Sequence, residues 1–286
     1  MTDNNDRLLE NDWVAVKRCR HGLMAYNVND SFIGRSLDLY GEWCEPELAL
    51  LGQILRPGDT AVDVGANIGT HGVFFARTVG PEGTVHAIEP QRITYQLLCA
   101  NTSLNALLNL RCHHAAAGAM AGQTVVPVLD PTAEQNFGAL AAGQFDEGEP
   151  VPVMTVDFLS LAKCRLIKID VEGGEANVLD GARETIETHR PALLVECNRP
   201  STGPDGLIKT ITEMGYQAWW HISAYFNPDN FFANDHNQFA NFAPEANLLC
   251  LPDNADAQIQ GLVPVDGLDD DWRKAVARIQ GGEGAL

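Results

Sequence analysis

Short apolar runs alternate with longer amphipathic segments between about residues 46 and 200. In the amphipathic segments the apolar side chains recur three or four positions apart, as at Ile93, Leu97 and Ala100. This alternation is typical of parallel strands connected by helices that cover both faces of a sheet. It predicts strands at residues 60–64, 84–89, 110–114, 124–128, 166–170 and 192–196, and helices at 73–79, 93–104 and 176–186.

The composition changes beyond residue 200, where we predict a helix at 207–214, strands at 216–221 and 247–252, and a helix at 272–279. Residues 216–242 contain nine of the chain's 21 aromatic residues, interleaved with Asn and Asp. A long loop inside a compact domain is more often functional than idle. We interpret the loop either as a substrate lid with stacking surfaces for sugars or flat rings, which we favour, or as a satellite hydrophobic cluster.

These patterns predict one main domain at residues 46–252, with an aromatic lid-like insertion at about 222–246. An N-terminal extension or cap at residues 1–45 precedes the domain, and an acidic tail at 253–286 follows it. The segment Tyr40–Trp43 either closes the other side of the site or has a plain packing role.

The chain is strongly acidic, with 19 Lys and Arg against 38 Asp and Glu and a net charge of −19. Such a charge repels polyanions, so nucleic acid is not an expected partner. No apolar run approaches the roughly 20 residues of a membrane span, and the first residues lack the apolar segment of a secretory signal. We therefore expect a cytoplasmic protein without a membrane span. The seven cysteines include no CxxC pair and predict neither a disulfide framework nor a zinc knuckle.

A glycine-rich turn, Gly65-Ala-Asn67-Ile-Gly69, connects the first predicted strand to the following helix. Glycine lets the backbone approach a ligand, and a helix N-terminus offers free N–H groups. Asp63 lies in the strand just before the turn, and Glu89 ends the next strand, where a carboxylate can accept hydrogen bonds from both ribose hydroxyls. The turn and the two acids predict a site for an adenosine-type cofactor.

The spacing of the turn indicates which cofactor it binds. Asn67 replaces the second glycine of the G-x-G-x-x-G motif that seats a pyrophosphate. Its side chain would crowd a pyrophosphate but suits a smaller ligand without phosphate, whose ammonium group carboxylates such as Asp63 can attract. S-adenosylmethionine fits this description, and a nicotinamide dinucleotide fits it less well.

Three motifs, GDTAVDVGANIGTHGVFFA, AIEP and IKIDVEGGEANVLDGA followed by PALLVE, resemble the FkbM family of class I S-adenosylmethionine-dependent methyltransferases. The resemblance covers roughly residues 40–200. It implies a Rossmann-like, doubly wound seven-stranded α/β sheet in the order 3-2-1-4-5-7-6, with the last strand antiparallel. It also implies O-methylation as the chemistry.

The resemblance carries over residue by residue as well. Asp63, Gly65, Asn67 and Gly69 would line the methionine end of the cofactor and Glu89 its ribose, with Asp170 beside the transferred methyl group. The third strand ends at His113-His114 rather than in the usual Asp and small residue. We therefore expect His114 or the nearby backbone to recognise adenine.

Candidate catalytic groups follow the carboxyl ends of the predicted strands, where open α/β sheets bind their ligands. Methyl transfer from a sulfonium requires alignment and, for an alcohol acceptor, a base. We select Asp170, His71 and Glu196 as catalytic candidates. Each has a structural alternative, as a helix cap or a helix-start residue, and His221 is a further candidate base.

Asp170, Glu196 and Asn198 also offer the oxygen ligands that Mg²⁺ accepts. Acids at strand ends more often bind helix N-termini or loop amides, so we expect no metal.

The sequence thus predicts an S-adenosylmethionine-dependent transferase that methylates a hydroxyl on a small molecule, saccharide or lipid-linked glycan. The alternatives are a nicotinamide-dependent Rossmann oxidoreductase and a non-catalytic cofactor-binding protein that acts through partners. The acceptor and the oligomeric state are not encoded in any motif of the chain.

Overall fold

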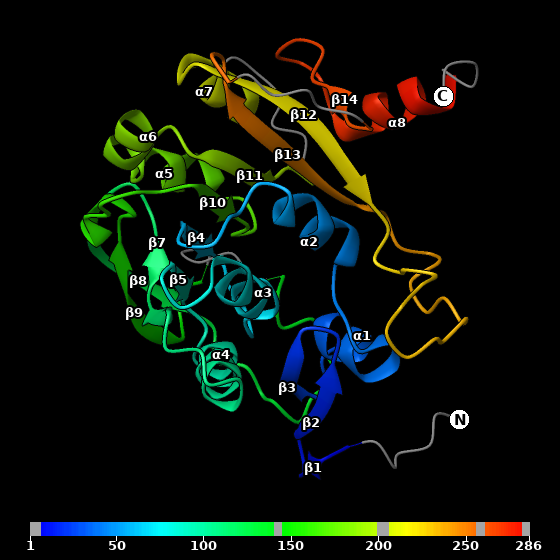
Figure 1. Cartoon of the computed structure of the whole chain (residues 1–286). Coiled ribbons are helices and arrows are strands. Elements are labelled where there is room, and N and C mark those ends of the chain that lie inside the picture. Colours follow the sequence, from blue (N-terminus) through cyan, green and yellow to red (C-terminus); the bar gives the residue numbers. More distant parts are fainter. Residues whose placement is uncertain (1–6, 140–144, 199–205, 256–260, 282–286) are drawn as a thin grey trace.

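The computed structural model describes residues 7–139, 145–198, 206–255 and 261–281. Within them, the centre of the molecule is an eight-stranded sheet in the order β14-β12-β13-β11-β10-β4-β5-β6 (Figure 1). Its strands are β4 (Thr60–Val64), β5 (Thr84–Glu89), β6 (Leu110–His114), β10 (Leu166–Ile169), β11 (Ala192–Glu196), β12 (Tyr216–Ser223), β13 (Glu245–Pro252) and β14 (Val263–Pro264).

The strand directions are those of a doubly wound α/β fold. Strands β4, β5, β6, β10 and β11 pair in parallel, whereas β13 runs antiparallel to both of its neighbours, β11 and β12. Counted along the chain without β14, the strands stand in the order 3-2-1-4-5-7-6. The two-residue strand β14 pairs with β12 and adds an eighth strand to the seven that the resemblance implies.

Helices cover both faces of the sheet because its strands are apolar on both sides. The helices α2 (Glu45–Gly52), α3 (Thr70–Val79) and α4 (Arg92–Leu104) pack into a core that includes Leu51, Phe75 and Leu98. A second core, around Ile167 and Trp220, includes residues of α5 (Glu175–Asp180), α6 (Arg183–His189), α7 (Leu207–Glu213) and α8 (Trp272–Gly281).

The helix predicted at residues 176–186 is two short helices, α5 and α6, separated at Gly181. The reason is a close backbone approach: a Cβ atom at Gly181 would lie 2.0 Å from the carbonyl oxygen of Gly118. The apolar period continues across the break, so the sequence pattern does not reveal it.

The strand predicted at residues 124–128 does not belong to the central sheet. It is β8 (Gly122–Val126), which forms a separate three-stranded sheet with β7 (Ala116–Ala117) and β9 (Glu149–Met154). β8 also begins and ends two residues earlier than the predicted strand. It ends before Pro127, which has no N–H group to donate to a neighbouring strand. A short 3₁₀ helix, η2 (Asp157–Leu159), leads back toward β10.

The N-terminal segment forms an antiparallel sheet of β1 (Leu9–Glu10), β2 (Val14–Cys19) and β3 (Gly22–Asn27), followed by α1 (Ile33–Tyr40). Asn101 of α4, which is fully buried, attaches this sheet to the glycine turn. Its side-chain amide donates to the carbonyl oxygens of Ala25 and Ile68 and accepts from the N–H of Ala25. The N-terminal sheet is therefore anchored against the turn.

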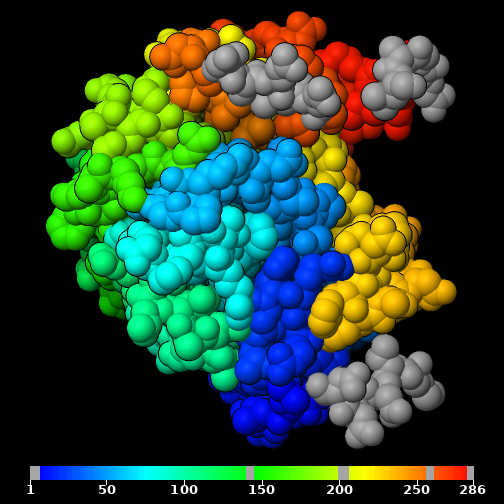
Figure 2. Space-filling model, viewed as in Figure 1, coloured from blue at the N-terminus to red at the C-terminus, as the bar shows by residue number. Residues whose placement is uncertain are grey.

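The aromatic loop between β12 and β13 lies against the N-terminal segment, as Figure 2 shows on the surface. Glu42 accepts hydrogen bonds from the side chain of Asn227 and the N–H of Phe231. Arg20 in turn donates to Glu42 and to the carbonyl oxygen of Asp229. The carboxylate of Glu42 thus joins two segments that lie about 190 residues apart in sequence.

The acidic segment after residue 252 packs on the far edge of the sheet. The buried indole of Trp220 donates to Asp270 at 2.9 Å, and Arg278 of α8 pairs with the same carboxylate at 2.6 Å. No helix in the described part of the chain is long and apolar enough to cross a membrane.

Candidate active site

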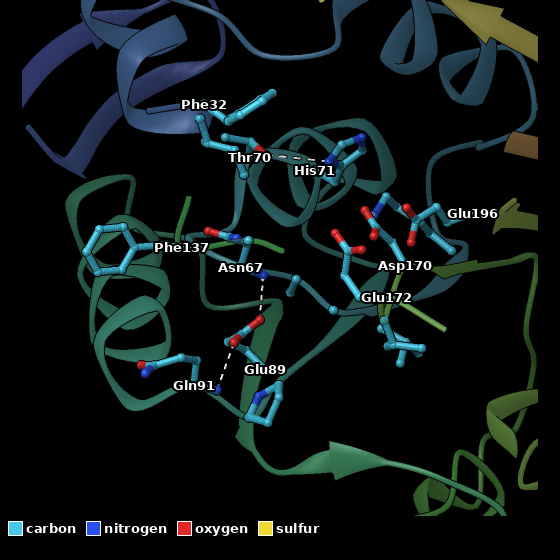
Figure 3. Close-up of a pocket in the computed structure, with 18 of the residues that line it drawn as sticks. Phe32, Asn67, Thr70, His71, Glu89, Gln91, Phe137, Asp170, Glu172 and Glu196 are labelled. Carbon is cyan, nitrogen blue, oxygen red and sulfur yellow. Dashed lines mark hydrogen bonds and ion pairs between the residues drawn. The ribbon is translucent and has the colours of Figure 1, made fainter. Parts of the chain in front are cut away.

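A pocket opens at the carboxyl ends of β4, β5, β10 and β11, where the loops of an open α/β sheet diverge (Figure 3). From the sheet and its loops it is lined by Val64, Gly65, Ala66, Asn67, Ile88, Glu89, Lys168, Asp170, Glu172 and Glu196. Glu245, at the start of β13, also lines it, as do Phe32, Trp43, Glu47, Phe137 and Tyr225 from outside the sheet, among others. The first set holds most of the predicted site. Of the others, Trp43 and Tyr225 lie in segments singled out from the sequence, whereas Phe32, Glu47 and Phe137 do not.

The glycine turn has a backbone that few residues can adopt. Gly65 has a φ of 78°, and a Cβ atom there would lie 1.7 Å from the carbonyl oxygen of Asp170. Asn67 has a φ of 49°, in the left-handed region that Asn tolerates better than most residues. Its side-chain oxygen accepts from the N–H of Ile68. Asn67 therefore shapes the turn as well as replacing a glycine.

Glu89 lies at the end of β5 with its carboxylate in the pocket. One oxygen accepts from the N–H of Asn67, and the other accepts from the N–H of Gln91 and the hydroxyl of Thr94, all at 2.8 Å (Figure 3). Burial raises the pKa of Glu89 to about 7, although these hydrogen bonds oppose the shift. The carboxylate is thus fixed in orientation while its charge stays sensitive to pH near neutrality.

Three residues predicted to bind the cofactor do not line this pocket among the described residues: Asp63, Gly69 and His114. Gly69 caps α3, and a Cβ atom there would lie 2.6 Å from Leu98. His114 stacks on Tyr95 at 4.6 Å and contacts the carbonyl oxygen of Pro90 at 3.1 Å. Both support the pocket wall from behind.

Asp63 is fully buried in β4, one layer behind the pocket. Its closest cation is the ammonium group of Lys168, at 3.9 Å, and Lys168 also contacts Asp170 at 3.0 Å. Burial raises the pKa of Asp63, against the opposing charges of Lys168 and His71. In this arrangement Asp63 acts on the pocket through Lys168, which lies between the two aspartates.

Asp170 and Glu196 lie at the carboxyl ends of neighbouring strands, and their pKa values are shifted in opposite directions. Burial opposes ionisation of Asp170, but Lys168 outweighs it and lowers the pKa of Asp170. Burial and the adjacent charge of Asp170 raise the pKa of Glu196 well above its usual value. The two carboxyls therefore titrate as a pair, in which ionisation of Asp170 opposes ionisation of Glu196.

Glu245 at the start of β13 continues this cluster of acids. The side chain of Asn198 donates to Glu196 at 2.7 Å and lies 3.4 Å from Glu245. Burial, with the charges of Asp170 and Glu47, raises the pKa of Glu245 to about 8. Sequence reasoning missed Glu245, since it follows the aromatic loop and belongs to no motif.

Three carboxylates could hold a metal ion: oxygen atoms of Asp170, Glu172 and Glu196 lie within 4.8 Å of one another. The predicted ligand Asn198 differs from this set, because its side-chain oxygen accepts from the N–H of Ala246 and its nitrogen faces Glu196. Glu172 is the third carboxylate of the set instead. It has a left-handed φ of 59°, where the chain turns after β10.

His71, the predicted base in the first turn of α3, pairs with a residue that sequence reasoning missed. Its Nε2 atom lies 2.7 Å from Oε1 of Glu47 in α2, and Glu47 is 2% exposed. The second oxygen of Glu47 accepts from the side chain of Asn247 in β13. Glu47 lies in a short, mostly apolar helix that carries no motif, so only the fold brings it to the pocket.

The aromatic loop contributes both to the pocket and to packing. Tyr225 stacks on Trp43 at 5.3 Å between ring centroids and contacts Phe32 edge to face at 5.7 Å, and all three rings line the pocket. Phe239, by contrast, is buried beneath them at 4% exposure. The loop thus combines a pocket-lining ring with a buried hydrophobic cluster, and Trp43 lines the pocket beside Tyr225. A role as a substrate lid stays a prediction.

Residues 63–218 match the family model described as Methyltransferase FkbM domain. A curated relative, the 31-O-demethyl-FK506 methyltransferase FkbM of Streptomyces tacrolimicus, is 30% identical over 206 residues, which are 60% of this chain and 77% of the relative.

Solved structures of methyltransferases also align with the chain. The methyltransferase FkbM of Methylobacillus flagellatus KT does so with a TM-score of 0.42 and 20% identity, over 71% of this chain and 50% of that chain. The O-methyltransferase TomG of Streptomyces achromogenes, involved in tomaymycin synthesis and solved with S-adenosylmethionine, gives a TM-score of 0.43 and 13% identity, over 76% of this chain and 85% of that chain.

Proposed function

Because the chain belongs to the FkbM family of methyltransferases, we propose that it transfers a methyl group from S-adenosylmethionine to a hydroxyl group on a small molecule, a saccharide or a lipid-linked glycan. The family supports methyl transfer that depends on S-adenosylmethionine and disfavours the nicotinamide-dependent alternative. The curated relative is named as a methyltransferase of an O-demethylated compound, which supports oxygen as the atom that receives the methyl group.

The observation that supports this function best is the composition of one pocket. It contains the glycine turn and Glu89 together with the strand-end groups Asp170, Glu196 and His71. A cofactor with its ribose at Glu89 and its methionine part along the turn would direct its methyl group toward those strand-end groups. Binding and chemistry then share a single cavity.

The residues present fit S-adenosylmethionine. Glu89 is held by three hydrogen bonds and can still accept from a ribose hydroxyl, because its two oxygens have four lone pairs and one of them, on the oxygen that faces Asn67, is unused. Gly65 has no side chain to block the approach of a ligand to the turn. Asn67 turns its side chain back onto Ile68, so the loop offers no open cradle for a pyrophosphate.

When bound, S-adenosylmethionine supplies a methyl group on a positively charged sulfur, so the chemistry needs little covalent help. The chain's own task is to align the acceptor oxygen and remove its proton as the oxygen–carbon bond forms. Asp170 presents a carboxylate whose charge Lys168 balances, and Glu196 presents a proton that can hydrogen-bond the acceptor. The rings of Phe32, Trp43 and Tyr225 would face the body of the acceptor.

We propose this reaction without Mg²⁺. Lys168 already neutralises Asp170, and Glu196 keeps its proton, so the three clustered carboxylates hold less negative charge than their number indicates.

The test is incubation of the full chain with methyl-labelled S-adenosylmethionine and a fractionated cell extract, with and without a chelator. We expect a labelled product with an alkali-stable ether linkage, formed at the same rate in both arms. Calorimetric binding of S-adenosylmethionine with no methyl transfer to any fraction would favour the non-catalytic alternative. Binding of a nicotinamide dinucleotide in its place would contradict the proposal.

A further inference from the structure

We infer that Glu47 is a positioning residue that fixes the proton of His71 on Nε2, so that Nδ1 of His71 accepts the proton of the acceptor hydroxyl. This inference rests on the proposed function and deepens it by assigning the base. Glu47 lies outside the part of the chain that matches the family model, which begins at residue 63.

The first observation is the distance between two buried atoms. Nε2 of His71 and Oε1 of Glu47 are 2.7 Å apart, and the two residues are 6% and 2% exposed. At this distance a hydrogen must lie between nitrogen and oxygen, because two lone pairs would repel each other. Neither atom has a well-aligned hydrogen-bond partner among the described residues, so the two atoms are each other's close polar contact.

The second observation is that Glu47 itself is held in place. Its other oxygen accepts from the side chain of Asn247 at 2.6 Å. Burial opposes ionisation of Glu47, but the contact with His71 and the nearby Lys168 and His221 together outweigh it and lower the pKa of Glu47. Glu47 is therefore an acceptor, and the hydrogen between the two groups belongs to Nε2 of His71.

The remaining nitrogen, Nδ1, faces Thr70 and not Glu47. It lies 3.5 Å from the hydroxyl of Thr70, at the limit of hydrogen-bond length (Figure 3). Thr70 and His71 both line the pocket. The electron pair on Nδ1 is thus available to a ligand, which is the geometry of a base oriented by a carboxylate.

The strand-end acids are less suited to take the proton. Asp170 contacts Lys168 at 3.0 Å, which weakens it as a base, and Glu196 is paired with Asn198 at the strand end. The charged and titratable groups that act on His71 or its partner include Glu47, Asp63, Lys168, Asp170, His221, Glu245 and Cys44.

The chain contains a matched control pair. His21 and Glu45 lie 2.8 Å apart through the same Nε2 atom, and Glu45 belongs to the same helix as Glu47. Neither lines the pocket among the described residues. A substitution at Glu45 thus removes a similar contact without touching the site.

The experiment compares Glu47→Gln, Glu47→Asp and Glu45→Gln in the full chain. Long-range ¹H–¹⁵N spectra of histidine-labelled protein report the tautomer of each imidazole without any acceptor, with His71→Phe assigning the signal. We expect the Nε2–H tautomer at His71 in the unsubstituted chain and a mixture of tautomers in Glu47→Gln. An Nδ1–H tautomer in the unsubstituted chain would overturn the inference.

The same variants are assayed with the extract fraction that the unsubstituted chain labels. We expect Glu47→Gln to slow methyl transfer by about 10²-fold and to shift the pH–rate profile, because general-base catalysis is typically worth this much or more. Glu47→Asp should recover part of the rate, Glu45→Gln should keep all of it, and S-adenosylmethionine affinity should change by less than about threefold in all three.

An unchanged rate and pH profile in Glu47→Gln would contradict the role of Glu47. If the unsubstituted chain labels nothing, the proposed function fails, while the spectra still decide the tautomer. If circular dichroism shows that Glu47→Gln does not fold, the role of Glu47 is decided by comparing the rate of Glu47→Asp with that of Glu45→Gln.

Discussion

The two ends of the pocket are built in different ways. The end at Glu89 is made of residues 65–91, and its hydrogen bonds run mostly between backbone N–H groups and one carboxylate. The other end assembles charged side chains from separate elements: Glu47, Lys168, Asp170, Glu196 and Glu245. In Figure 3 the labelled residues of these two groups lie on different sides of the cavity. Under the proposed function, cofactor binding would depend on local backbone shape, whereas acceptor chemistry would depend on tertiary packing.

The largest effect should come from removing Glu89. We expect Glu89→Ala to weaken S-adenosylmethionine binding by about 10- to 100-fold, since a hydrogen bond from a ribose hydroxyl to a charged group is lost, worth about 1.5–3 kcal/mol, and the N–H groups of Asn67 and Gln91 lose their acceptor. Isothermal titration calorimetry measures this. The control is Glu187→Ala, on an exposed part of α6. Equal affinities in the two variants would mean that the ribose lies elsewhere.

The next largest effect should come from Gly65, where the glycine turn approaches the backbone carbonyl of Asp170. We expect Gly65→Ala to lower the free energy of unfolding by about 3 kcal/mol, because a left-handed φ is strained and the new Cβ would overlap the carbonyl of Asp170. Gly58→Ala is the matched control: its φ is 86°, but nothing lies within 4 Å of the Cβ position. That control should lose only about 1–2 kcal/mol in urea unfolding. Equal losses would show that backbone strain alone, and not the contact with Asp170, restricts Gly65.

The same contrast explains how much the sequence could predict. Strands β4, β5, β6 and β11 begin and end at the predicted residues, because apolar runs flanked by turns encode them locally. The positions of Asn67 and Glu89 in the pocket also follow from their place after a strand. The fold class could thus be predicted before the structure was known.

The rest could not be predicted, because it depends on contacts distant in sequence. Glu47 contacts Asn247 across 200 positions, and neither residue belongs to a motif. Asp63 has the right position in its strand, but its burial behind Lys168 depends on how β10 pairs with β4. The sequence analysis did not predict the three-stranded N-terminal sheet, because no helices separate its strands and the alternation of strands and helices is absent there.

A smaller effect should appear in the pH dependence of cofactor binding. The pKa of Glu89 is raised to about 7 by burial, so the carboxyl is partly protonated at neutral pH in the free protein. Ribose hydroxyls bind the ionised form better, so affinity should fall as the pH drops below about 7, by about tenfold for each unit. Calorimetry in buffers of different ionisation enthalpy should detect proton release on binding at pH 6.5.

The control for this pH dependence is Glu89→Gln, which cannot ionise and should bind weakly with an affinity that changes less with pH. A pH dependence that is the same in both proteins would assign the titration to another group, such as the amino group of the ligand.

The smallest effect should come from Asn67. If its main role is to allow the left-handed backbone of the turn, Asn67→Gly should keep S-adenosylmethionine affinity within about threefold, since glycine adopts this conformation freely. Asn67→Ala should cost more in stability, about 1 kcal/mol, because alanine is strained there. A loss of affinity above tenfold in Asn67→Gly, measured by calorimetry, would instead show that the side chain contacts the cofactor. The cofactor end would then depend on side-chain recognition as the acceptor end does, and the contrast between the two ends would not hold.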